Sequence, residues 1–203
     1  MQQNGYPVQS FTTVYPGDVK YVDLTGENII DANDRKAIGY STTAPDIYYN
    51  FHLGAEYKGI GLDAMFQGVG RWTGFMTTNG LYRSAVATNT LSQYLYENSW
   101  SAERGNTESA LFPRLSTTSN ANNDLNSTLN MFDRSYIKLR YVELYYHLPK
   151  SLLNKLSVIN NVKLYVRGTD LFTADHLDKA DAASYGVAQP LTRSVQLGAA
   201  LTF

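Results

Sequence analysis

The last eleven residues of the chain, RSVQLGAALTF, alternate without a break between apolar side chains and polar or small ones. A period of two is typical of a β-strand with one apolar face and one polar face. Eleven strand residues at about 3.3 Å each, tilted by about 40°, rise roughly 28 Å, close to the hydrocarbon thickness that an outer-membrane strand crosses. The pattern therefore predicts a membrane strand over residues 193–203.

Four earlier segments repeat this alternation, namely Tyr48–Tyr57, Ile60–Arg71, Val142–Leu148 and Val162–Phe172. Their charged side chains fall on one face only, as lipid contact on the other face would require, because a Lys or Arg at mid-depth costs about 2–4 kcal/mol. The charged residues expected to face the lumen are Asp63, Glu143, Lys163 and Arg167. A soluble β-sandwich also keeps charges off its apolar face, so alternation alone leaves both architectures open.

The connections between these segments distinguish a membrane barrel from a soluble β-sandwich better than alternation does. Lys58-Gly59 is a two-residue hairpin signal, and residues 149–161 form a modest turn with room for a short helix. The other links are long and polar, and short turns on one side with long loops on the other are typical of outer-membrane barrels. We therefore expect an extracellular segment 1–47, a hairpin 48–71, an extracellular loop 72–134, a hairpin 135–172, an extracellular loop 173–192 and the terminal strand 193–203.

Three stretches depart from simple alternation. Ile137 and Leu139 are out of phase with Val142 and Leu144, which predicts a β-bulge or face switch near Arg140. Apolar residues at helical spacing predict a loop helix within 84–100. The polar, low-complexity segment 116–128 is expected to be mobile.

Composition supports extended β-structure, since 203 residues include 16 tyrosines and 15 glycines with only 17% charged residues. The absence of cysteine excludes disulfides, Cys-ligated metals and thiol catalysis. A formal net charge of −1 gives no electrostatic attraction for nucleic acid. No apolar run is long enough for a transmembrane helix, and the first residues do not have the pattern of a signal peptide.

Five stretches together resemble the C-terminal part of the SusC/RagA family of TonB-dependent outer-membrane transporters. They are PGDVKYVDLTGENIIDANDR (Pro16–Arg35), FHLGAEYKGIGLDAMFQGVG (Phe51–Gly70), SYIKLRYVELYYHLPKSLLNKL (Ser135–Leu156), VKLYVRGTDLF (Val162–Phe172) and the closing VQLGAALTF. In order and spacing they cover most of the chain, and their combination is specific. The resemblance implies that residues 1–203 are part of a receptor β-barrel domain, an all-β fold of antiparallel transmembrane strands.

The resemblance further implies a barrel of about twenty-two strands around an N-terminal plug, in the outer membrane of a Gram-negative, Bacteroidetes-like bacterium. It implies a TonB complex acting through the plug and a SusD-like surface lipoprotein acting as a lid. Import of glycans or peptides would be driven by the proton-motive force. Phe203 resembles the terminal aromatic residue that the barrel-assembly machinery recognises. Outer-membrane lipid is an expected partner and nucleic acid is not.

The chain differs from the family pattern in its extent. About five membrane strands are expected, whereas the smallest outer-membrane barrels have eight. The plug, the TonB-contacting segment and a signal peptide are not recognisable, so we interpret the chain as the C-terminal portion of a transporter. Two alternatives stay open: a secreted carbohydrate-binding β-sandwich, and a truncated product without independent activity.

The segment DLTGENIIDAND is similar to a twelve-residue calcium loop. The positions that would ligate the ion hold Asp23, Thr25, Glu27, Ile29 through its carbonyl, Asp31 and Asp34. Calcium takes six to eight oxygen ligands, but Asn28 stands where such loops have glycine. A structural polar loop without an ion is the preferred interpretation, and no cofactor is expected.

Aromatic residues are frequent in the long predicted loop, and Trp72, Tyr82 and Trp100 are candidates for contact with sugar rings or a lid protein. The alternative, which we prefer for each single residue, is that they fold the loop onto itself or form a membrane-interface girdle. The three histidines stand in no metalloprotease or nucleophile motif, and no glycine-rich phosphate loop is present. The sequence therefore predicts that the protein is not an enzyme.

Overall fold

The computed structural model describes residues 6–78, 81–84, 90–153, 158–177 and 191–203. The chain divides into two compact units. The loop unit comprises residues 1–38 and 75–132, and the sheet unit comprises residues 39–74 and 133–203.

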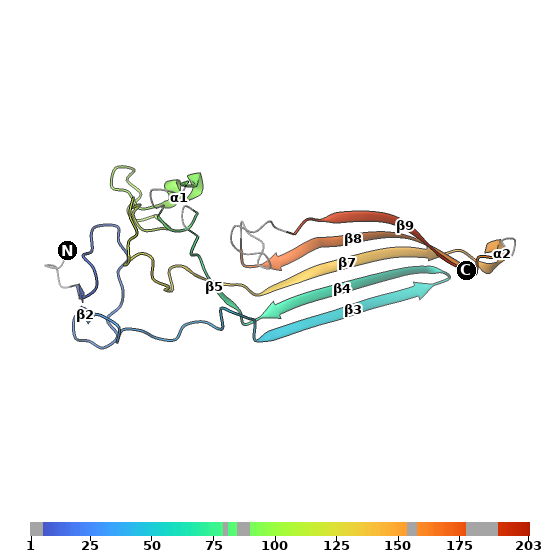
Figure 1. The fold of residues 1–203 in the computed structure, drawn as a ribbon, viewed down its shortest axis with the longest axis horizontal. Coiled ribbons are helices and arrows are strands. Elements are labelled where there is room, and N and C mark those ends of the chain that lie inside the picture. Colours follow the sequence, from blue (N-terminus) through green and yellow to red (C-terminus); the bar gives the residue numbers. More distant parts are fainter. Residues whose placement is uncertain (1–5, 79–80, 85–89, 154–157, 178–190) are drawn as a thin grey trace. The chain divides into compact units, whose positions relative to one another are not determined.

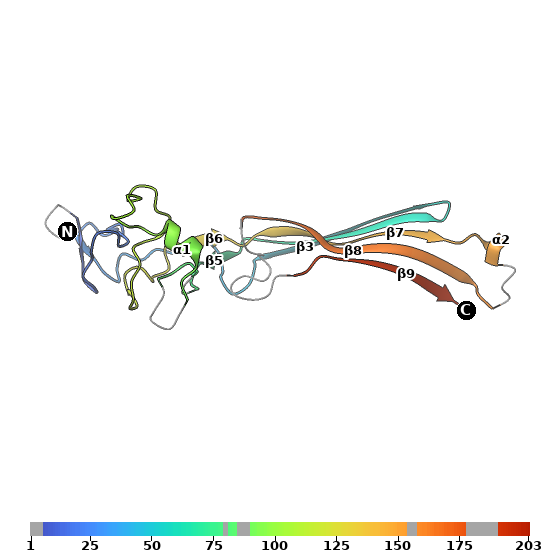
Figure 2. The same ribbon diagram turned by 90° about the horizontal axis from the view of Figure 1, so that it is seen from above.

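The sheet unit is built on five antiparallel strands in the order β3-β4-β7-β8-β9. Their bounds are Ile47–Tyr57 for β3, Ile60–Gly70 for β4, Tyr136–His147 for β7, Asn161–Asp175 for β8 and Ser194–Thr202 for β9. Each strand lies where alternation predicts one, so the all-β prediction is confirmed. A one-turn helix, α2 (Lys150–Leu153), follows β7, as the turn prediction allowed. Figures 1 and 2 show the strands as one twisted layer.

The β3–β4 hairpin has the turn that its sequence predicts. Lys58 and Gly59 both have left-handed backbone angles, with φ of 51° and 84°. Positive φ at both central residues defines the type I′ turn, whose twist matches that of the flanking strands. The turn also joins the next strand, because the His147 N–H donates to the Gly59 carbonyl at 2.7 Å.

Direct cross-strand pairing aligns the apolar residues into continuous rows. One row crosses all five strands through Ala55, Leu62, Leu144, Val166 and Leu197. Directly paired residues point to the same face of a sheet, so the strands share one apolar face. That face is open within the described residues: Leu62 is 51% exposed, Leu144 54% and Leu197 82%. These side chains therefore do not form the interior of a water-soluble globule.

The predicted irregularity at Arg140 is a double bulge. Met65 pairs with Tyr141 and Phe66 with Leu139, which leaves Arg140 unopposed on β4. On the other side, the two β8 residues Asp170 and Leu171 stand opposite the single residue Arg140. Asp170 has a φ of 52°, and its carboxylate binds the Arg140 Nη1 at 2.9 Å. The ion pair therefore joins the extra residues of both strands.

Three of the four strand seams carry a tyrosine ring over a directly paired glycine. Tyr49 covers Gly68, Tyr145 covers Gly61 and Tyr165 covers Gly198, so that a Cβ on each glycine would overlap the ring. Because each tyrosine ring needs a residue without a Cβ beneath it, it can pair only with the glycine on the next strand. The pairs therefore specify strand register, which alternation alone leaves free to shift by two residues.

The loop unit contains little regular structure. β1 (Val8–Gln9) pairs in parallel with β2 (Ile29–Ile30), and β5 (Thr73–Phe75) pairs with β6 (Met131–Asp133) where the chain passes between the two units. The loop helix predicted within 84–100 is present as α1 (Gln93–Asn98), capped by Ser92, with residues 85–89 outside the described part of the chain. No helix in the described ranges is long and apolar enough to cross a membrane.

We predict that Gly61→Ala destabilises the sheet by about 1–3 kcal/mol, because the new methyl group forces Tyr145 off its glycine. The measurement is urea unfolding of the protein refolded in lipid vesicles. Gly54→Ala is the matched control on the neighbouring strand, since its Cβ would meet nothing closer than an Asp63 oxygen at 3.5 Å. Equal losses of stability for the two variants would show that the ring–glycine contact does not fix the register.

Candidate functional site

The polar face of the sheet is organised around Glu143. Its carboxylate accepts hydrogen bonds from the Lys163 Nζ at 2.6 Å and from the Arg167 Nε at 2.7 Å. The Glu143 side chain is only 4% exposed, whereas those of Lys163 and Arg167 are 28% and 43% exposed. A buried carboxylate held by two cations is electrostatically satisfied and leaves one positive charge on the face.

A second polar group lies beside this cluster. The His52 Nε2 is 2.8 Å from an Asp63 oxygen, and the Tyr141 hydroxyl also bonds to Asp63. The Tyr145 hydroxyl donates to Glu56 at 3.1 Å after passing over Gly61. These contacts bring several aromatic and charged side chains together on one face.

All four charged residues predicted to face the lumen therefore lie on the polar face. Asp63, Glu143 and Arg167 form one cross-strand row, and Lys163 reaches Glu143 from its own pairing with His147, two rows away on the same face. Sequence analysis missed His52 and Glu56, although alternation places both on the same side as Asp63. The arrangement suits contact with water or a polar surface, since every one of these side chains is paired within the sheet.

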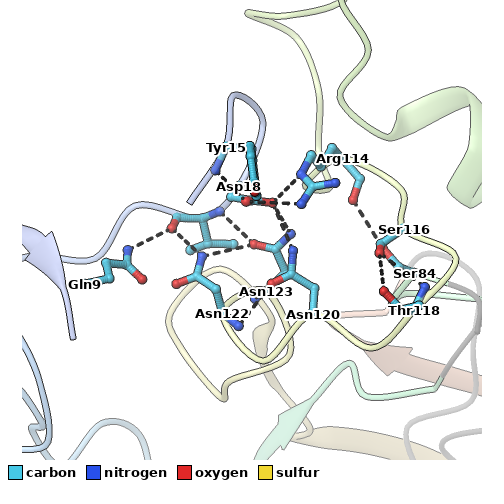
Figure 3. A network of polar contacts seen from close by, with 11 residues as sticks. Gln9, Tyr15, Asp18, Ser84, Arg114, Ser116, Thr118, Asn120, Asn122 and Asn123 are labelled. Atoms are coloured by element: carbon cyan, nitrogen blue, oxygen red, sulfur yellow. Dashed lines mark hydrogen bonds and ion pairs between the residues drawn. The ribbon is translucent and has the colours of Figure 1, made fainter. Parts of the chain in front are cut away.

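In the loop unit, Asp18 is the centre of a buried polar network (Figure 3). Its side chain is 1% exposed and accepts from the Arg114 Nε at 2.7 Å and from the Asn120 and Asn123 amides at 3.0 and 2.9 Å. The Tyr15 N–H donates to its other oxygen at 2.8 Å. One carboxylate thus connects segments about 100 residues apart, which sequence analysis did not find.

The neighbouring residues explain the Pro16-Gly17-Asp18 sequence. Gly17 has a φ of 87°, and the Trp100 ring lies where a Cβ would be. The Gly17 carbonyl accepts from the Arg114 N–H at 2.8 Å. Glycine is required there by both the backbone angle and the ring contact.

The asparagine-rich segment 116–128, which composition predicts to be mobile, is joined to this network by several side-chain hydrogen bonds. The Asn123 side chain accepts from the Val19 N–H at 2.8 Å, and the Asn122 amide donates to the Val19 carbonyl at 2.8 Å (Figure 3). Asn122 is fully buried. The two asparagine side chains thus bond to both backbone groups of Val19, as a neighbouring β-strand would. The polar composition of the segment gives no sign of this role.

The calcium-like loop uses its carboxylates to bind its own backbone. Asp23 accepts from the N–H groups of Gly26 and Asn28 at 2.7 Å each, and Asp34 accepts from those of Leu24 and Asp31 at 2.8 and 2.9 Å. These bonds, led by those from Gly26 and Asp31, hold the pKa of both carboxyls below the ordinary value.

The remaining positions of this loop contribute less. Asn28 has a φ of 61°, the left-handed conformation for which such loops use glycine. The Thr25 hydroxyl donates to the Asp23 carboxylate, and the Asp31 carboxylate accepts from the Asn33 N–H. Glu27 and Ile29 are exposed. No group of three His, Asp or Glu side chains in the described ranges is placed to hold a metal ion. The preferred interpretation, a structural polar loop without an ion, stays a prediction from sequence.

The three candidate aromatics contact their own part of the chain. The Arg134 guanidinium lies 3.5 Å from the centre of the Trp72 ring, and Tyr82 lies 6.5 Å from Phe112. Trp100 covers Gly17. Phe203, the predicted assembly signal, follows β9 and is 72% exposed. The geometry therefore favours self-contact over ligand binding for the three loop aromatics.

Comparison with known proteins finds one curated receptor and several solved importer structures that are similar to this chain. TonB-dependent receptor P3 of Formosa agariphila is 30% identical over 167 residues, which is 82% of this chain and 15% of the receptor. The solved RagAB peptide importer matches in its open-open state with 24% identity and a TM-score of 0.66, over 91% of this chain and 20% of that one. Its closed-closed state matches with 25% identity and a TM-score of 0.64, over 86% and 19%. No family model matches the chain.

These matches support the SusC/RagA-type TonB-dependent receptor fragment that the sequence resembles. The chain spans about 15% of the length of the curated receptor and about a fifth of the solved importer chain. The antiparallel strands of the sheet unit have the fold of the corresponding part of the solved importer. These relatives are a receptor and an importer rather than enzymes, in agreement with the expectation from sequence.

We predict that the calcium-like loop loses its order only in acid. Because both aspartate pKa values are lowered by folding, their stabilisation is complete above the ordinary value of about 3.9 and is lost as pH falls through the lower folded-state values. Amide exchange protection of Gly26, Asn28 and Asp31 should be constant from neutral pH to about 4 and should then decrease.

Two controls make this measurement specific. Asp23→Asn should lower the exchange protection of the Gly26 and Asn28 amides. The Asp31 amide, which donates to Asp34, should keep its protection. A calcium chelator at neutral pH should leave all three amides unchanged. Loss of protection on chelation would instead identify an occupied ion site.

Proposed function

We propose that the chain forms part of the wall and the outer loops of a TonB-dependent outer-membrane importer. The observation that carries this proposal is the continuous, exposed apolar face of the sheet, with charge confined to the opposite face. Soluble monomers rarely expose apolar patches larger than a few hundred Å². A face on which Leu62, Leu144 and Leu197 lie in one cross-strand row is suited to lipid.

In this proposal the polar face lines the lumen, and the loop unit lies outside the cell. The short links at Lys58-Gly59 and around α2 occur at one end of the strands, and the segments of the loop unit leave from the other end (Figure 1). Outer-membrane barrels place short turns in the periplasm and long loops outside. The paired charges around Glu143 would then contact water, solute or a plug within the barrel.

We infer that the imported solutes are peptides or glycans and that a SusD-like lipoprotein closes the outer side. Support for a peptide comes from the related solved structures, which are described as a peptide importer in open and closed states. The TonB complex would supply the energy through a plug. Assembly into the outer membrane would begin from the strand that ends near Phe203.

We predict that Leu197→Lys destabilises the protein in lipid vesicles by about 2–4 kcal/mol, because the charge faces hydrocarbon. The neighbouring Gln196→Lys should cost less than about 1 kcal/mol, since it adds only like-charge proximity to Arg167 on the polar face. Urea unfolding in vesicles measures both. If this face met water instead of lipid, a lysine at the highly exposed Leu197 would be nearly neutral, and that result would contradict the membrane assignment.

A growth experiment tests the transport proposal. Deletion of the gene should abolish growth on either oligopeptides or oligosaccharides as the sole carbon source, and the wild-type gene on a plasmid should restore it. Affinity-tagged receptor extracted in mild detergent should retain a surface lipoprotein in a stoichiometric complex. Normal growth of the deletion strain on both nutrient classes would reject import of either.

A further inference from the structure

The short-link end of the sheet unit has a recess that the import proposal leaves unused. Its walls are the β3–β4 turn at Lys58 and Gly59, Tyr146 at the end of β7 with the following Leu148, and the helix α2. All of these residues belong to the sheet unit.

Backbone bonds hold the walls of this recess in place. The Gly59 carbonyl accepts from the His147 N–H at 2.7 Å, and the Leu148 N–H donates to the Val162 carbonyl at 2.9 Å. A Cβ at Gly59 would lie 2.9 Å from the His147 carbonyl oxygen, so the turn approaches β7 as closely as glycine permits. Leu153 of α2 is buried against this end. The recess is therefore part of the folded sheet.

The recess is electropositive. Lys58 and Lys150 line it, and neither forms an ion pair with any residue in the described ranges. Residues 144–169 include four lysines and arginines but no Asp or Glu. The carboxylate nearest in sequence to the turn, Glu56, accepts from the Tyr145 hydroxyl on the polar face. Two ammonium groups at the edge of an apolar surface favour an anionic ligand.

An apolar surface continues from this recess. Tyr146 pairs directly with Leu164 and shares the apolar face with Leu144, and its side chain is partly exposed. Tyr57 and Ile60 flank the turn and are largely exposed. A molecule with an anionic head and long hydrocarbon chains would match both the lysines and the apolar face.

We propose that this recess binds the phosphodiester headgroup of an anionic phospholipid, with Lys58 and Lys150 contacting the phosphate and the acyl chains lying along the apolar face. The proposal rests on the membrane location argued above, which places a phospholipid leaflet at this level. Each lysine near an anionic lipid surface should strengthen binding about fivefold. The site would anchor the short-turn end of the wall at a fixed depth.

A local lipid probe tests this proposal. The protein is expressed from its full gene with Leu152→Cys, an exposed position on α2, labelled with bimane and reconstituted in phosphatidylcholine vesicles. Quenching of the bimane by spin-labelled phosphatidylglycerol is then compared with quenching by spin-labelled phosphatidylcholine. We expect a preference for phosphatidylglycerol of up to about 25-fold, from about fivefold for each of the two lysines, decreasing as salt is added.

The variants separate the site from general lipid contact. Lys58→Asn keeps the left-handed turn, because Asn tolerates positive φ, and with Lys150→Gln it should reduce the preference about fivefold per lysine. Lys150→Arg should retain the preference, and Lys20→Gln in the loop unit should leave it unchanged. Equal quenching by both lipids would overturn the headgroup site alone. The absence of quenching by either lipid would overturn the membrane wall as well.

Discussion

The structure of the sheet unit depends on keeping charge off one face of a single layer. Alternation does this within one strand, but the apolar residues of all five strands must also point to the same face of the sheet. The row from Ala55 through Leu144 to Leu197 shows that they do. The consequence appears on the other face, where the strand residues Asp63, Glu143, Lys163 and Arg167 bring their charges together. A carboxylate as buried as Glu143 is stable there only because Lys163 and Arg167 bind it. The apolar pattern and the ion pairs are thus two results of one constraint.

Register matters more in such a sheet than in most, because a shift of one residue would bring Glu143 to the apolar face. Tyrosine rings over paired glycines fix the register at three seams. The fourth seam, between β7 and β8, has the ion pairs of Glu143 and of Arg140 with Asp170. The bulge at Arg140 also reverses the phase of β7, so that Leu139 faces the same side as its partner Phe66. What breaks the alternation in the sequence therefore preserves the face in the structure.

The sequence was sufficient for the strands, the hairpin turn and the bulge, because each is determined by side chains within a few residues of one another. The loop unit was not predictable in this way. Asp18 is joined to Arg114 and Asn123 by bonds between side chains about 100 residues apart, and no period in the sequence marks them. Segment 116–128 has the composition of a mobile loop, yet its asparagine side chains bind the Val19 backbone and the Asp18 carboxylate. The carboxylates of Asp23 and Asp34 could either bind an ion or accept hydrogen bonds from backbone N–H groups. The spacing of the residues in the sequence is compatible with both roles.

The pairing of charges on the polar face also bears on selectivity. Lys163 and Arg167 share Glu143, and the positive charge left over is offset by the nearby Asp63 carboxylate, so little net field extends from this wall. In an importer, such a wall would offer a solute hydrogen bonds and ring faces without preferring either sign of charge. Discrimination between solutes would then depend on surfaces with uncompensated groups. Within the described part of the sheet, the lysines at the short-turn end are such groups, and they adjoin the apolar face rather than the charged cluster around Glu143. Solute contact and membrane anchoring would therefore use different faces of the same five strands.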